Sequence, residues 1–124
     1  MAIVISRSES QLSATTSFQA MDNLAGSTVS SSFTVPTNVS AIKSLTISVT
    51  ADGAEEFVPL VKISGNSMRD GDAVFAGAPV MGAIAMAQVQ YDTNLAVQPG
   101  NSCEFSISVT DAATISAVVT AQFE

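Results

Sequence analysis

The 124-residue chain contains no histidine, no tryptophan, one cysteine and only four basic residues. Without histidine, general acid–base catalysis near neutral pH would need a perturbed carboxylate, thiol or amine. Eleven acidic residues give a net charge of -7, which repels phosphate backbones. We therefore expect a single domain that is not an enzyme and that binds no nucleic acid.

The N-terminal quarter of the chain is rich in Ser, Thr and Gln. Residues 1–31 are expected to form an N-terminal strand and a Ser/Thr-rich arm, because apolar residues are concentrated at positions 3–5. The arm is either a loop or an extended segment whose tip docks as an edge strand, on its own subunit or on a neighbour. A helix is conceivable over 17–25, where Phe18, Met21 and Leu24 fall at helical spacing.

Two-residue periodicity begins at residue 42, where Leu45, Ile47 and Val49 alternate with Ser and Thr. This alternation is typical of a strand with one buried face and one face in solvent. It returns over 105–110 and 115–123. Further strands are expected over 32–35, 56–64, 72–75 and 83–91.

Turn signals separate these strands, at 52–53, 70–72 and 99–101. Each turn contains a glycine, which tolerates the positive φ that many turns require. Short antiparallel strands with close turns predict an all-β chain, in which residues 32–124 form a β-sandwich that is jelly-roll-like. Immunoglobulin-like and barrel strand orders stay open.

The sharpest local motif is Ser-Gly-Asn-Ser-Met over 64–68. It resembles the Gly-x-Ser-Met segment around the nucleophile of self-cleaving repressors and signal peptidases, in which a lysine activates the serine. That resemblance would make Ser67 a nucleophile, but no lysine follows Lys62 in this chain. We therefore expect a turn here and no catalytic residue.

The aspartates of the next turn raise the question of a metal site. Asp70 and Asp72 could supply oxygen ligands to calcium together with Asn66 and Ser67, although the closing glutamate of an EF-hand is missing. The expectation is a turn without cofactor, and calcium at Asp70 and Asp72 is the alternative. Cys103 cannot form an intrachain disulfide and is expected to be a half-buried small hydrophobic residue, with an intermolecular disulfide as the alternative.

Residues 73–87 form the longest stretch without a charged or strongly polar side chain. It is too short for a membrane span, which needs about 18 residues, and Gly77, Pro79 and Gly82 interrupt it. The stretch is either a strand buried on both faces or a flat apolar surface that a neighbouring copy covers. In the second case the subunit contacts would be Phe75, Val80, Met81, Ile84 and Met86.

In general pattern, the N-terminal arm, the Ser/Thr-laced strands and the acidic balance resemble the small jelly-roll and sandwich proteins that form or decorate the capsids of bacterial and archaeal viruses. That resemblance implies a shell, cement or spike component of a virion that contacts copies of itself and other capsid proteins. The scarcity of positive charge favours an outer position, away from the genome. The competing hypothesis is a cell-surface or secreted adhesion or ligand-binding module on a similar sandwich.

Overall fold

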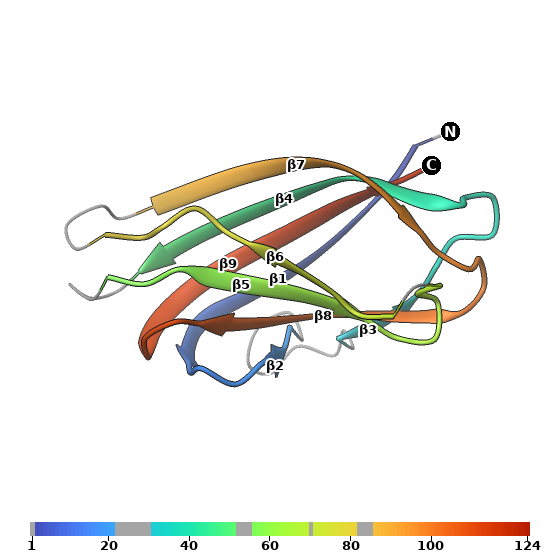
Figure 1. Ribbon diagram of the computed structural model, residues 1–124. Coiled ribbons are helices and arrows are strands. Elements are labelled where there is room, and N and C mark those ends of the chain that lie inside the picture. The colour runs from blue at the N-terminus through green and yellow to red at the C-terminus, as the bar shows by residue number, and fades with distance from the viewer. Residues whose placement is uncertain (1, 22–30, 52–55, 70, 82–85) are drawn as a thin grey trace.

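The computed structural model describes residues 2–21, 31–51, 56–69, 71–81 and 86–124, and this part of the chain contains strands and no helix (Figure 1). The strands are β1 (Ile3–Ala14), β2 (Gln19–Ala20), β3 (Ser32–Thr34), β4 (Ala41–Ala51), β5 (Pro59–Ser64), β6 (Ala73–Ala76), β7 (Met86–Ala96), β8 (Ser102–Val109) and β9 (Ala113–Phe123). Within these residues no helix is long and apolar enough to cross a membrane.

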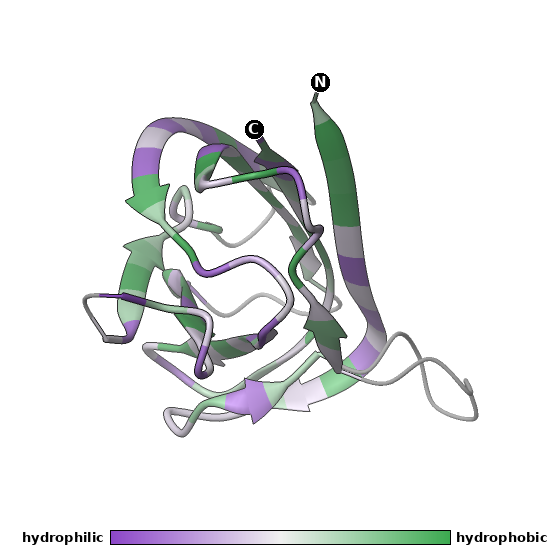
Figure 2. Cartoon of the chain, turned by 90° about the vertical axis from the view of Figure 1, so that its right-hand side faces the viewer, coloured by the Kyte–Doolittle hydropathy of each residue, from purple (hydrophilic) through white to green (hydrophobic). Residues whose placement is uncertain are grey.

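The strands form two antiparallel sheets that face each other across one core (Figures 1 and 2). Sheet A has the order β1-β9-β4-β7, and sheet B has the order β2-β8-β5-β6, with β3 also paired to β8. The chain passes between the sheets repeatedly, so that neighbouring strands come from distant parts of the sequence. This double-sheet arrangement is a jelly roll. The predicted all-β, antiparallel, jelly-roll-like sandwich is confirmed.

The core consists of the alternate side chains that the sequence pattern placed inward. In β4, Leu45, Ile47 and Val49 are buried, whereas Thr46 and Ser48 between them are half-exposed. The strands β8 and β9 also contribute every second residue to the core. Figure 2 shows hydrophobic and hydrophilic residues alternating along the strands. The predicted alternation of buried and solvent-facing residues is therefore confirmed in β4 and β9, whereas in β8 Ser106 and Ser108 are buried as well.

The N-terminal segment follows the second of the two alternatives, an extended segment that docks as an edge strand, and is not a loop. Residues 3–14 are strand β1, which pairs with β9 of the same chain from Ile3↔Phe123 to Ala14↔Ala113. A register shift interrupts this pairing between Glu9 and Leu12, where Gln11 adopts a φ of 56°. Instead of a helix, the described part of 17–25 contains the short strand β2, while 22–25 lie outside the described residues.

The stretch 73–87 is not a strand buried on both faces. Strand β6 ends at Ala76, and its residues alternate between half-buried and exposed. The chain then passes close to β5, where the Gly77 N–H donates to the Pro59 carbonyl at 2.7 Å. A Cβ atom on Gly77 would lie 2.6 Å from the Pro59 ring, so the close approach requires glycine here.

Candidate interaction surface

The structure divides the five predicted contact residues between the core and the surface. Val80 is 0% exposed and bridges Phe57, so it belongs to the core of the single chain. Phe75 is half-buried. Met81 and Met86 are 48% and 58% exposed. Ile84 lies outside the described residues.

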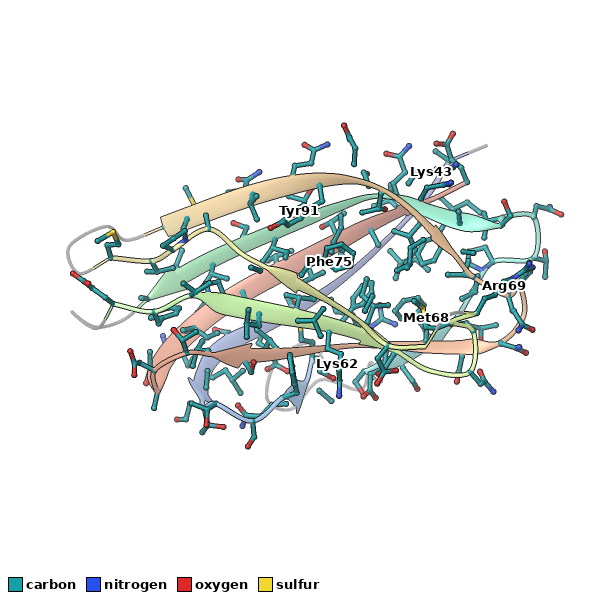
Figure 3. All side chains as sticks on the ribbon, in the orientation of Figure 1. Lys43, Lys62, Met68, Arg69, Phe75 and Tyr91 are labelled. Carbon is teal, nitrogen blue, oxygen red and sulfur yellow. The ribbon has the colours of Figure 1, made fainter. Side chains whose placement is uncertain are left out.

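Phe75 joins the two sheets at one side of the sandwich. Its ring centroid lies 5.5 Å from that of Tyr91, which comes from β7 in sheet A (Figure 3). The Tyr91 hydroxyl donates a hydrogen bond to the carbonyl of Ala76 in β6. The strands β6 and β7 are the edges of different sheets, and these two contacts close the sandwich between them.

Sheet A presents a broad face away from the core, which we call the outer face of sheet A. Three rows across β1, β9, β4 and β7 make up its centre: Ser8, Val118, Ser48 and Gln88; Ser6, Thr120, Thr46 and Gln90; and Val4, Gln122, Ser44 and Asp92. All of these side chains are half-exposed or exposed. The face is thus covered mainly by hydroxyl and amide groups.

Hydrogen bonds between strands order several of these groups. The hydroxyls of Ser6 and Thr120 lie 2.8 Å apart, and the Thr50 hydroxyl donates to the Ser116 carbonyl at 3.3 Å. The charged groups of this face lie toward one end, where Lys43 donates to the side chain of Asn94 at 2.6 Å. The rows through Val118 and Thr120 contain no charged residue.

The outer face of sheet B is different, because the chain itself covers part of it. Ser106 and Ser108 alternate with core residues of β8, yet both are buried. The Phe18 ring, just before β2, lies 4.9 Å from the ammonium group of Lys62 in β5. The two sheets therefore differ in how much of their outer faces remains accessible.

The Ser-Gly-Asn-Ser-Met motif forms a turn after β5, as predicted. Gly65 adopts a φ of +128°, and the Ser67 N–H donates to the Ser102 carbonyl at 3.0 Å. The Asn66 side-chain oxygen accepts the Ser102 N–H at 2.8 Å. Ser67 is buried, and neither lysine lies beside it, since Lys43 binds Asn94 and Lys62 contacts Phe18.

Cys103 is buried more deeply than predicted. Burial raises the pKa of its thiol, and the neighbouring Ser67 side chain and Glu104 backbone offset part of this increase. Asp72 is exposed, and Asp70 lies outside the described residues. Within the described ranges, no three His, Cys, Asp or Glu side chains gather as they would around a metal ion.

No family model and no curated protein matches this sequence. Solved structures do share its fold. The globular domain of the zebrafish complement 1qA protein is 11% identical, with 95% of this chain and 94% of that chain covered and a TM-score of 0.59. The PRD1 vertex protein P5 is 16% identical, with 98% and 96% covered and a TM-score of 0.58.

A chain of the cyanophage Pam1 capsid asymmetric unit is 15% identical, with 98% of this chain and 83% of that chain covered and a TM-score of 0.56. At such identities the likeness shows a common fold. The predicted resemblance to virion sandwich proteins is confirmed at that level, because a phage vertex protein and a phage capsid chain both align over nearly the whole chain. The protein is therefore a jelly-roll β-sandwich domain of a kind that occurs in viral capsids and in complement 1qA.

Proposed function

We propose that this chain is a structural protein of a virion, a component of the capsid shell, its decoration or a spike, and that it has no enzymatic role. It acts by contacting copies of itself and other capsid proteins. The observation that carries this proposal is the end-to-end likeness to the PRD1 vertex protein, which covers 98% of this chain and 96% of that one. The whole domain, and not one motif, is what the two proteins share.

The surface chemistry supports the same function. Assembly proteins bury accessible surface against partners, and charged groups are depleted from the centres of such contacts. In the outer face of sheet A, the rows through Val118 and Thr120 contain only uncharged side chains on four long strands. A net charge of -7 also supports a position on the outside of a particle, away from nucleic acid.

The second candidate is an extracellular adhesion or ligand-binding module, and the likeness to the complement 1qA globular domain favours it. Binding of sugars commonly uses an exposed aromatic ring. All seven aromatic residues of this chain lie within the described ranges, and each is buried or half-buried. Tyr91 already contacts Phe75 and Ala76. Assembly is therefore the better-supported role.

Light scattering after size exclusion, together with electron microscopy, separates the two candidates. The full chain is expected to form a defined oligomer or regular arrays, with a mass that depends on concentration. A strictly monomeric chain that binds members of a glycan array would overturn the virion proposal and support the adhesion module. Substitution of Ser67 by Ala is expected to leave assembly intact, since its side chain is not on the accessible surface.

A further inference from the structure

We propose that the outer face of sheet A is the surface through which copies of this chain contact one another. The inference rests on the proposed function, which requires self-association, and it names the part of the molecule that carries it. Four properties of this face lead to a second copy as the occupant: the lack of charge at its centre, its self-complementary polar groups, the exposed valine among them and its size.

The distribution of charge restricts where two acidic chains can meet. Each copy has a net charge of -7, and burying like charges opposite each other is unfavourable. Of the acidic residues that the structure describes, Asp92 is the one that points outward from the paired rows of sheet A, on the edge strand β7. Glu9 in β1 is buried, and the exposed Glu124 follows the end of β9. Glu56, Asp72 and Asp111 lie in loops, and Glu104 lies in sheet B. A contact centred on the rows through Val118 and Thr120 thus keeps the carboxylates of both copies apart.

The polar groups of the face suit a partner with the same groups. Hydroxyl and amide side chains both donate and accept hydrogen bonds, whereas carboxylate and ammonium groups do only one of these. A face built from Thr46, Thr120, Gln88 and Gln90 can therefore pair with a copy of itself in many registers. A self-complementary patch is what a two-fold contact between identical subunits requires.

An apolar side chain lies at the centre of this polar face. Val118 in β9 is 44% exposed, with Ser8 on one side and Ser48 on the other. Adjacent Val119 points into the core and is fully buried, so the exposure of Val118 follows from the strand alternation. Removing Val118 from water on contact with a second copy would stabilise the complex. The polar side chains around Val118 would then form the rim of the contact.

The size of the face fits a contact between small proteins. Four strands about 4.8 Å apart, each rising about 3.4 Å per residue, give the paired part of sheet A a flat area of roughly 600 Å². This is about a tenth of the 6042 Å² accessible surface of the chain, a share typical of standard protein contacts.

A matched pair of substitutions tests the inference. Val118→Glu places a carboxylate at the centre of the face, while Val74→Glu places the same group on an outward position of β6 in sheet B, where the valine is 53% exposed. Sedimentation and light scattering are expected to show at least about a tenfold loss of self-association for Val118→Glu and little change for Val74→Glu. Circular dichroism and the melting temperature show whether each variant is folded.

A second measurement does not depend on weakening the contact. The one native cysteine is buried, so a cysteine introduced by Ser48→Cys in a Cys103→Ala background reacts with a maleimide according to the accessibility of the face. In the oligomer this reaction is expected to be at least about tenfold slower than in diluted monomer, with Val74→Cys as the unprotected control.

The outcomes separate the inference from the function beneath it. A wild-type chain that stays monomeric at about 100 µM would overturn self-association, and with it both proposals. A wild-type oligomer that persists in folded Val118→Glu, with position 48 unprotected, would overturn the inference alone. Loss of association in Val74→Glu and retention in Val118→Glu would place the contact at the side of β6 instead.

Discussion

The turn after β5 permits a sharp test of how closely the chain is packed there. Gly65 adopts a φ of +128°, a conformation that L-residues rarely adopt. In Gly65→Ala, the new Cβ atom would lie 2.5 Å from the Ser102 carbonyl oxygen and 2.9 Å from the Cα atom of Cys103. Both are backbone atoms of β8. The turn cannot easily move away, because the same carbonyl accepts the Ser67 N–H at 3.0 Å.

The expected loss follows from two contributions. The backbone conformation costs an alanine about 1–3 kcal/mol. Overpacking against the backbone of β8 adds about 1–3 kcal/mol, since no flexible side chain can give way. Gly65→Ala should therefore lower the free energy of unfolding by about 2–6 kcal/mol, a large part of the 5–15 kcal/mol that is usual for a domain. With about 4 °C per kcal/mol for a chain of this size, the melting temperature should fall by about 8–24 °C.

Gly100→Ala is the matched control, because Gly100 has a φ of +83° but no atom within 4 Å of the position of a Cβ. It carries the conformational cost alone, about 1–2 kcal/mol. Urea unfolding followed by circular dichroism measures both variants. If Gly65→Ala were no more destabilising than Gly100→Ala, the close approach of the turn to β8 would be refuted as the reason for the glycine.

Three further predictions concern the core, the thiol and the closure between the sheets. Phe123→Ala should lower the free energy of unfolding by about 3–5 kcal/mol because its ring is fully buried near the C-terminus, whereas Gln122→Ala on the outer face should change it by less than about 0.5 kcal/mol; similar urea midpoints would contradict this. Burial raises the pKa of the Cys103 thiol, so the unfolded chain, with a thiol pKa of about 8.5, loses this proton first as pH rises. Stability should then fall above about pH 8 by up to about 1.4 kcal/mol per pH unit, and a Cys103→Ala variant with the same decline would disprove the assignment. Tyr91→Phe should cost about 1 kcal/mol through loss of the hydrogen bond to the Ala76 carbonyl, which an unchanged urea midpoint would contradict.

The sequence predicted strands best where one face is wholly apolar. In β4 and β9 the inward positions hold Leu, Ile, Val, Ala and Phe, and the outward positions are mostly Ser, Thr and Gln, so hydropathy alone identifies the strand and its buried face. Strand order could not be read in this way, because it depends on which strands pair. The pairing of β1 with β9 joins residues from opposite ends of the chain.

The sequence left a loop open for part of β1 because the polar residues Arg7 and Glu9 occupy inward positions between Ile5 and Leu12. Arg7 lies at the edge of sheet A, with its guanidinium carbon 4.9 Å from the centre of the Phe33 ring of β3. Glu9, two residues on, is buried. An edge strand allows long polar side chains to pack beside the core, and these remove the apolar alternation that sequence analysis relies on.

The candidate surface was also missed by hydropathy, for a related reason. Hydropathy indicates the apolar stretch 73–87 as a contact surface. In the structure, however, Val80 belongs to the core and Phe75 closes the sandwich. The outer face of sheet A is made of hydroxyl and amide groups, which in sequence look like any solvent-facing side of a strand. The absence of charge from the rows through Val118 and Thr120 becomes visible only when pairing places β1, β9, β4 and β7 side by side.

In the long strands of sheet A, neighbouring residues face opposite ways, one into the core and the next toward solvent. In β9, Val119 faces the core and Val118 faces outward, and in β4 the same holds for Ile47 and Ser48. A carboxylate at position 119 would be buried without a partner and would unfold the chain, whereas at position 118 it would remain in solvent in the single chain. The inward residues of these strands therefore determine the fold, whereas their outward residues can change without disturbing the core.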